Sequence, residues 1–127
     1  MNDRRRLRAT FNARRDAALA LMDAHGVKRS SAAPPLHRLL WRVGVRIPPP
    51  PMASFALNAA LMGVAFGVLW GLAMWLCAQQ VEGLPGVAAI ATVGVPLAGL
   101  MFGVTMALVF RRLSRRHGLP HWRDIDP

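Results

Sequence analysis

Residues 55–77 read FALNAALMGVAFGVLWGLAMWLC, and residues 86–110 read GVAAIATVGVPLAGLMFGVTMALVF. Neither stretch contains an acidic, basic or histidine side chain. A helix rises about 1.5 Å per residue, so even the shorter stretch would be roughly 35 Å long, enough to cross a hydrocarbon core of about 30 Å. A buried helix of this length in a soluble protein would show a polar face, and neither stretch has one. The sequence therefore predicts two membrane-spanning helices.

The placement of the basic residues predicts how these two helices are oriented. Residues 78–85 are enough for a tight external turn, so the spans would form a hairpin. All Lys and Arg lie outside it, eleven within residues 1–46 and five within residues 111–123. Because basic flanks stay on the cytoplasmic side, both termini are expected in the cytoplasm. The expected fold is an all-α membrane protein: a two-transmembrane-helix hairpin with an N-terminal amphipathic helix and a short interfacial helix.

The composition agrees with a membrane protein. The 127 residues are 54% hydrophobic and yet carry a formal net charge of +10, a combination that is rare in soluble proteins. Arg greatly outnumbers Lys, and with abundant Ala, Gly and Pro this indicates a GC-rich bacterial genome. The N-terminal arginines are not followed by the apolar segment of a signal peptide, and a mitochondrial presequence is the alternative. Cys77 is the single cysteine, so an internal disulfide is impossible.

Residues 1–50 are expected to form a basic cytoplasmic or interfacial region. Residues 3–25 predict an amphipathic helix that begins at Asp3 and ends before Gly26. Its apolar side chains either lie on an anionic membrane surface or pack against a partner or a neighbouring segment. Residues 27–35 are expected to be a loop.

A short interfacial helix is predicted over residues 36–43. Its apolar face would consist of Leu36, Leu39, Leu40 and Val43, with His37, Arg38 and Arg42 on the opposite side. Trp41 lies beside these arginines, which suits the headgroup region of a membrane. The four prolines of residues 48–51 cannot continue a helix and are expected to form a stiff, extended lead-in to the first span.

The second span is expected to continue beyond the apolar stretch. Pro96 interrupts it and predicts a kink. The helix is then expected to run to His117 and to stop at Gly118. Residues 111–127 would form a basic cytoplasmic tail.

Small residues recur at helical spacing in both spans. One face of the first span carries Gly63, Gly67 and Gly71, and one face of the second carries Gly99, Gly103 and Ala107. In lipid, small residues let two helix backbones approach closely, and this approach supplies packing energy. The two faces could pack against each other within the hairpin, or drive oligomerisation, or reflect chance in a chain rich in Ala and Gly.

No residue pattern predicts catalysis, a cofactor or a metal site. The spans lack the ionisable side chains that proton relays and ion pathways need, and their polar side chains are Asn58, Thr92 and Thr105. His117 and His121 are four residues apart, but Gly118 breaks the helix that would align them on a metal. We therefore expect neither an enzyme nor an autonomous transporter.

Residues 34–50, PPLHRLLWRVGVRIPPP, form a more distinctive motif than a short interfacial helix and a proline-rich linker would need. Together with residues 63–75 and the sequence LPHW at residues 119–122, this segment resembles a family of small bacterial membrane proteins known as domain of unknown function, number 6404. The resemblance covers roughly residues 10–124 and implies a two-span inner-membrane protein of uncharacterised activity. Family members often have His-Phe after the prolines, where this chain has Pro51 and Met52, so a role for that histidine does not carry over.

The leading functional hypothesis is a non-enzymatic protein that works by interaction. Residues 34–50 would form a platform at the inner leaflet that docks a membrane protein or anionic lipid headgroups, or they would only seat the hairpin. The side chains expected to make contacts are His37, Arg38, Trp41, Arg42 and Arg46, with Arg111 and Arg112 on the other flank. The alternative is a holin-like oligomeric pore-former, which the long N-terminal region opposes. Nucleic acid is not expected as a partner, because membrane topology already explains the basic flanks.

Overall fold

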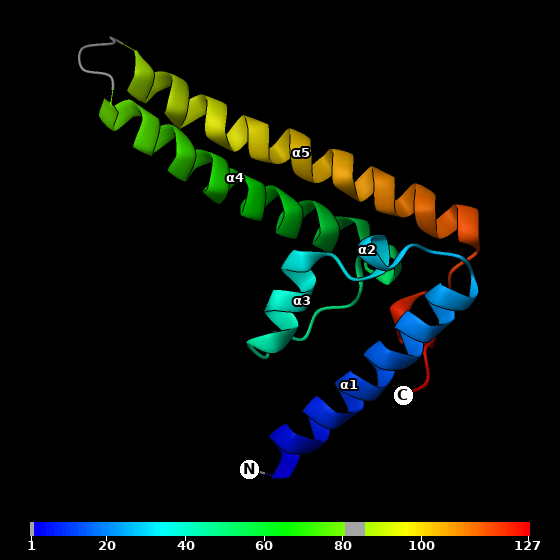
Figure 1. Ribbon diagram of the computed structural model, residues 1–127. Helices are drawn as coiled ribbons and strands as arrows, with labels where there is room; N and C mark the ends of the chain where they lie inside the picture. The colour runs from blue at the N-terminus through cyan, green and yellow to red at the C-terminus, as the bar shows by residue number, and fades with distance from the viewer. Residues whose placement is uncertain (1, 81–85) are drawn as a thin grey trace. The chain divides into compact units, whose positions relative to one another are not determined.

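The computed structural model describes residues 2–80 and 86–127, and all regular structure in these residues is helical (Figure 1). The elements are α1 (Asn2–Ala24), α2 (Arg29–Ala32), α3 (Pro35–Arg42), η1 (Pro50–Met52), α4 (Phe55–Gln80), α5 (Val87–His117) and η2 (Trp122–Asp124), where η marks a short 3-10 turn. The all-helical fold predicted from the sequence is confirmed. The chain divides into two compact units: unit 1 comprises residues 1–54 and 110–127, and unit 2 comprises residues 55–109.

Unit 2 consists of α4 and the greater part of α5, two helices that run antiparallel side by side (Figure 1). α4 begins at Phe55, the first residue of the predicted span, but it continues to Gln80. The prediction that residues 78–85 form the turn is therefore wrong for the first three of them, because Ala and Gln favour a helix. Residues 81–85 of the predicted turn lie outside the described residues.

α5 is one helix of 31 residues that contains Pro96. A proline cannot donate a backbone hydrogen bond, so the helix loses one bond there but continues. The hydroxyls of Thr92 and Thr105 donate to the carbonyls of Ala88 and Met101, each at 2.7 Å, so both side chains are satisfied within the helix. α5 ends at His117 as predicted. Gly118 follows with a φ of +61°, a left-handed conformation that favours glycine at helix ends.

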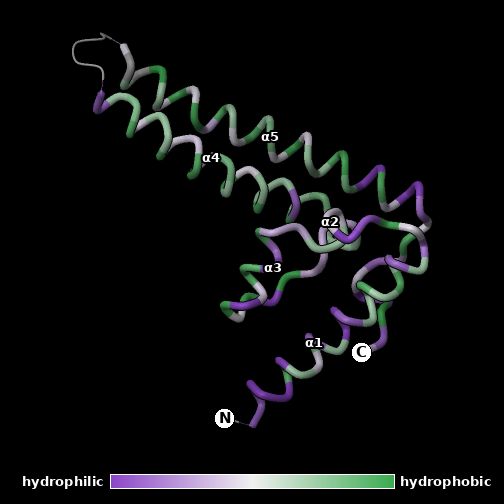
Figure 2. Tube along the Cα trace, in the orientation of Figure 1, coloured by the Kyte–Doolittle hydropathy of each residue, from purple (hydrophilic) through white to green (hydrophobic). Residues whose placement is uncertain are grey.

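Both helices are long and apolar enough to cross a membrane: the most apolar stretch within Phe55–Gln80 has a mean hydropathy of 2.0, and that within Ile90–His117 has 2.1 (Figure 2). Only 11% and 22% of their most apolar windows are buried. The exposed side chains include Val64, Leu69, Trp75, Val93 and Leu100. An apolar helix that belongs to the core of a soluble protein is mostly buried, so these helices do not have the burial of such a core.

Glycines bring the backbones of α4 and α5 into direct contact. A Cβ atom added to Gly63 would lie 2.8 Å from the carbonyl oxygen of Gly99, and one added to Gly99 would lie 2.9 Å from the carbonyl oxygen of Gly63. A Cβ on Gly103 would meet the carbonyl oxygen of Ala59 at a shorter distance still. At these positions the helices are too close for any side chain. The rings of Phe66 and Phe102 stack beside this contact, with centroids 4.3 Å apart.

Unit 1 is built on a small apolar core that both flanks of the chain share. Its buried members are Ala18, Met22, Val27, Ala32, Met52 and Ile125, against which Leu113, Leu119 and Trp122 are partly buried. The predicted N-terminal helix is present as α1, whose residues 2–10 are exposed and whose later turns carry the core residues Ala18 and Met22. Of the alternatives for this helix, packing against neighbouring segments of its own chain is the one that its later turns adopt.

Two local predictions for unit 1 are wrong. The predicted loop of residues 27–35 contains the one-turn helix α2, because Ala32 is buried in the core and the small residues before it fit a helical turn. The prolines of residues 48–51 are not extended throughout: Pro50 and Pro51 begin η1 and are buried. Proline is suited to the first positions of a helical turn, since the N–H that it lacks would have no partner there.

The C-terminal segment is attached to α1 through aromatic and polar contacts. The ring of Trp122 lies 5.6 Å from that of Phe11, and the guanidinium of Arg14 lies 5.7 Å from the Trp122 centroid. The Nδ1–H of His117 donates to the carbonyl oxygen of His25 at 2.9 Å. Residues more than ninety positions apart are therefore held together in unit 1.

The glycine contact in unit 2 predicts that a Gly→Ala substitution destabilises the protein only where the two helices touch. We expect Gly103→Ala to lower the free energy of unfolding by about 1–3 kcal/mol, because the new Cβ would overlap Ala59 and Gly63 of α4. Thermal unfolding of the protein in detergent micelles, followed by circular dichroism, measures this effect. The matched control is Gly94→Ala on the same helix, where the Cβ meets only the Ile90 side chain at 3.9 Å. Equal melting of the two variants would contradict the prediction.

Candidate functional site

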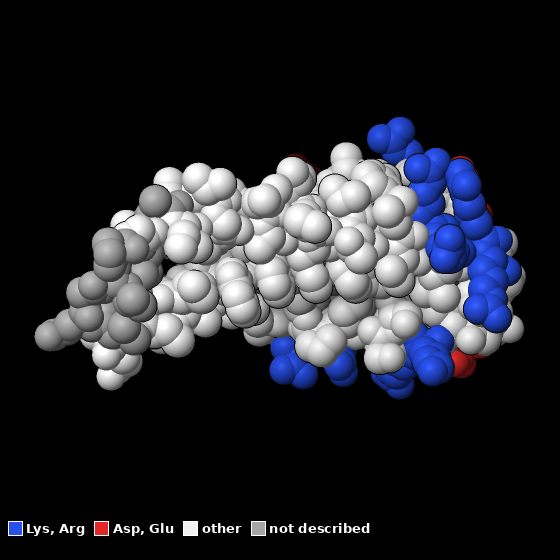
Figure 3. All heavy atoms as spheres, turned by 90° about the horizontal axis from the view of Figure 1, so that it is seen from above, with Lys and Arg blue, Asp and Glu red and all other residues white. Residues whose placement is uncertain are grey.

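The basic residues of the chain are all part of unit 1. This unit holds sixteen Lys and Arg side chains and five of the six acidic ones, a formal net charge of +11. Fourteen of the sixteen basic side chains are exposed, and Figure 3 shows them gathered over the surface that unit 1 presents in that view. No acidic residue occurs between Asp23 and the end of α4. The exposed surface of unit 1 is thus suited to binding an anionic partner.

The predicted interfacial helix is present as α3, one residue earlier than expected at each end. Pro35 occupies the first helical position, where proline is favoured. After Arg42 the chain turns at Gly44, whose φ is +91°, and the N–H of Val45 donates back to the carbonyl of Leu40 at 2.9 Å. The side chains of Arg38, Arg42 and Arg46 are exposed.

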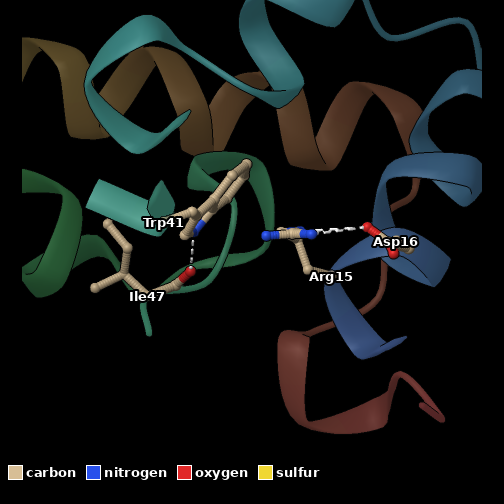
Figure 4. Close-up of polar contacts among 4 residues, drawn as sticks. All are labelled: Arg15, Asp16, Trp41 and Ile47. Carbon is tan, nitrogen blue, oxygen red and sulfur yellow. Dashed lines mark hydrogen bonds and ion pairs between the residues drawn. The ribbon is translucent and has the colours of Figure 1, made fainter. Parts of the chain in front are cut away.

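Trp41 makes contacts within unit 1. Its indole N–H donates to the carbonyl oxygen of Ile47 at 2.9 Å, and the ring is partly buried (Figure 4). The guanidinium of Arg15 on α1 lies 5.4 Å from the Trp41 centroid and is itself bonded to Asp16 at 3.2 Å. A buried indole N–H needs a partner, and here the turn after α3 supplies it. Trp41 therefore joins α3, its following turn and α1, and is not displayed as a free anchor.

His37 is also internal, although the sequence placed it on the polar side of α3. Its side chain is 1% exposed, and its ring lies edge-on to that of Trp41 at a centroid distance of 6.2 Å. The Nδ1 atom is buried and has no hydrogen-bond partner within the described residues. Burial lowers the pKa of His37 to about 4, because the charged imidazolium would lose its hydration. His37 is therefore neutral near pH 7 and cannot act as an exposed cationic contact.

Apolar side chains are also exposed on α3 and in the turn after it, although they were not among the candidate site residues. Leu39 is 57% exposed and Val43 is 68% exposed, and Val45 in the next turn is 41% exposed. The sequence signal was present, since Leu39 and Val43 are four residues apart on the predicted apolar face. That pattern usually marks the buried face of a helix. Here His37 is the buried residue of α3, whereas Leu39 and the C-cap residue Val43 are exposed.

The remaining candidate residues fall into two groups. Arg111 and Arg112 are exposed on the part of α5 that belongs to unit 1, one turn before the exposed Arg115 and Arg116. The packing candidates lie in unit 2, where Gly63, Gly67 and Gly71 of α4 face α5, Gly99 and Gly103 of α5 face α4, and Ala107 is fully buried. Gly67 is looser than its neighbours, since its Cβ would be 3.9 Å from the Cα of Gly99. The structure thus brings the two glycine faces together within one chain.

The described residues contain no group of three His, Cys, Asp or Glu side chains that could hold a metal ion. His121, one of the histidines considered from the sequence, accepts a hydrogen bond at Nδ1 from the backbone N–H of Arg123 at 3.2 Å. Cys77 is exposed on α4 and carries a free thiol.

Comparison with known families gives one match that covers most of the chain. Residues 9–125 match a family described as "Family of unknown function (DUF6404)". No curated protein and no solved structure matches the chain.

The buried His37 predicts that unit 1 is less stable in acid. An unfolded chain binds a proton at His37 below about pH 6.5, whereas the folded unit does not until about pH 4. Stability is therefore lost as the pH falls from 6.5 towards 4, by up to about 1.4 kcal/mol per pH unit. Urea unfolding followed by tryptophan fluorescence at pH 7 and pH 5 measures this loss.

We expect His37→Gln to show a smaller difference in unfolding free energy between pH 7 and pH 5 than the parent protein. The matched control is His25→Gln at an exposed position, which should keep the parental difference. The same pH dependence in His37→Gln and in the parent would contradict the assignment of the effect to His37.

Proposed function

Because the chain belongs to the family of unknown function DUF6404, whose description assigns no activity, we propose its function from the chain itself. The protein is a non-enzymatic membrane protein in which α4 and α5 cross the bacterial inner membrane as a hairpin. Unit 1 is a basic cap on the cytoplasmic side that binds anionic lipid headgroups.

The observation that carries the proposal is the shared core of unit 1. The chain leaves this unit at Ser54 and returns to it at Phe110, and the core contains both Met52 and Ile125. Two segments that share one folded core must lie on the same side of a membrane. The hairpin therefore has to enter and leave through the same leaflet. The basic residues of both flanks favour the cytoplasmic side.

The character of unit 2 supports its place in lipid. Its apolar side chains are mostly exposed, and the hydroxyls of Thr92 and Thr105 are satisfied within α5. The helices touch backbone to backbone at glycines, which is the way in which helices associate where apolar burial contributes little. The exposed apolar side chains are unfavourable in water and favourable in hydrocarbon, where the satisfied hydroxyls and the glycine contacts are also compatible with the surroundings.

The charge of unit 1 supports anionic lipid as its partner. Each basic side chain close to an anionic membrane surface contributes about 1 kcal/mol. Only part of the fourteen exposed basic side chains can reach one surface at a time, yet a few are sufficient for stable contact. A cap fixed to the membrane by two spans is also held permanently near the headgroups. We therefore propose lipid, and not nucleic acid, as the principal anionic partner.

The holin-like alternative receives less support. A pore needs several chains to associate through helix faces that are free in each chain. The glycine faces, which were the candidates for that association, are already in contact within one hairpin through Gly63, Gly99 and Gly103. A homo-oligomer would have to use the faces that carry large apolar side chains instead.

The proposed topology predicts the position of reporters at both ends. In cells that express the chain with a reporter that is fluorescent only in the cytoplasm, fusions at residue 1 and at residue 127 should both be fluorescent. Fusions of a reporter that is active only in the periplasm should be inactive at both ends. A periplasmic signal from either terminus would contradict the proposal, because unit 1 could not then fold from both flanks.

Anionic lipid should stabilise unit 1 in a salt-dependent manner. In nanodiscs that contain about a third phosphatidylglycerol, we expect a higher melting temperature than in nanodiscs of phosphatidylcholine alone, because the lipid binds the folded cap. The difference should shrink between 50 mM and 500 mM salt, as screening increases. The same melting temperature in both lipids at low salt would contradict lipid binding by the cap.

A further inference from the structure

α3 and the turn after it, residues 38–46, combine two kinds of exposed side chain, one aliphatic and one basic. Leu39, Val43 and Val45 are apolar and exposed. Arg38, Arg42 and Arg46 are basic, exposed and interleaved with them. The polar side chain that would normally face water, His37, is 1% exposed. We call residues 38–46 the α3 edge.

Internal contacts fix α3 in this orientation. Turning the helix so that Leu39 and Val43 were buried would bring His37 to the surface and would break the hydrogen bond from Trp41 to the Ile47 carbonyl. It would also separate the Trp41 ring from the guanidinium of Arg15. The exposure of the apolar side chains is therefore a property of the folded unit and not of a loosely held helix.

The chemistry of the α3 edge matches the boundary between lipid headgroups and acyl chains. Apolar side chains of an interfacial helix enter this boundary by about 5–10 Å. Arginines beside them extend their guanidinium groups to the phosphates while their methylene chains remain in the apolar region. The segment from residue 24 to residue 54 contains no acidic side chain that would be repelled by those phosphates.

The chain itself holds the α3 edge close to the membrane. Arg46 is nine residues before Phe55, where α4 begins. Nine residues reach at most about 30 Å when fully extended, and the prolines and η1 shorten this distance. If α4 crosses the membrane, the α3 edge stays within this distance of the leaflet that α4 enters.

We propose that the α3 edge inserts into the headgroup–acyl boundary of an anionic leaflet, with Leu39, Val43 and Val45 in contact with acyl chains and the three arginines on phosphates. This inference rests on the proposed function and names the lipid-contacting element within the cap. The partner is the lipid surface and not a protein, because basic side chains interleave with the apolar ones along the whole edge. A protein partner would have to offer acidic groups at each of those positions.

Site-specific labels test this proposal in the full-length protein. Cys77→Ser removes the native thiol, and Leu39→Cys or Val43→Cys then accepts an environment-sensitive fluorophore such as NBD. The labelled proteins are reconstituted into vesicles with about a third phosphatidylglycerol. Ser30→Cys, at an exposed polar position of α2, is the control for water. Val68→Cys, exposed on α4, is the control for the hydrocarbon core.

We expect labels at residues 39 and 43 to emit at shorter wavelength than the label at residue 30. They should be quenched by lipids with a nitroxide near the headgroup end of the acyl chain and protected at least twofold from aqueous iodide. The label at residue 68 should be quenched best by nitroxides deeper in the chain. A double substitution, Arg42→Glu with Arg46→Glu, should shift the label at residue 39 towards water, whereas Arg4→Glu with Arg5→Glu should not.

Three outcomes would overturn the proposal, and they are distinct from one another. Labels at residues 39 and 43 that iodide quenches as strongly as the label at residue 30 reject the inserted edge, while a lipid-buried label at residue 68 leaves the proposed function intact. Labels at 39 and 43 that neither iodide nor lipid nitroxides quench indicate that a second copy of the chain covers the edge. A label at residue 68 in water rejects the proposed function itself.

Discussion

The apolar core shared by the two flanks is the constraint on which the rest of the molecule depends. Met22 from the first helix, Met52 from the segment before α4 and Ile125 from the C-terminal segment are buried together. Because this core needs both flanks, the chain must leave unit 1 along α4 and return to the same unit along α5. The charge pattern alone favours a topology in which both termini lie on the same side of a membrane. The shared core is an independent physical reason for the same topology.

The contacts within unit 1 also determine which side chains are available for binding. Arg15, Trp41 and the Ile47 carbonyl form one connected set, and His37 is buried beside the indole ring. A buried Nδ1 atom with no hydrogen-bond partner among the described residues is unfavourable. Burial also lowers the pKa of His37, so the ring stays uncharged near pH 7 and the unit loses stability in acid. With His37 buried on one side of α3, the arginines and aliphatic side chains on the other side are exposed. In unit 1 apolar side chains of residues 38–46 are therefore exposed and His37 is buried.

The hairpin follows a different packing rule from unit 1. Its closest contacts are between backbones at Gly63, Gly99 and Gly103, with the stacked rings of Phe66 and Phe102 beside them, and many of its large apolar side chains are exposed. This arrangement lets two helices fit together without a large buried core. It also occupies the small-residue faces, so any association between chains must use other surfaces.

Length, hydropathy and the positions of Gly and Pro determined the four longer helices of this protein from the sequence alone, although not α2 or η1. The first residue of α4, the end of α5 at Gly118 and the presence of α3 all follow from local patterns, because helix propensity and capping act within a few residues. The six small residues of the hairpin contact could be named, but whether they meet within a chain required the fold. Tertiary structure alone decided that His37 is buried, that Trp41 is partly buried against the turn to Ile47, and that Leu39 and Val43 face outwards. Periodicity identifies the two faces of an amphipathic helix, but only the neighbouring segments, here α1 and the turn to Ile47, decide which face is covered.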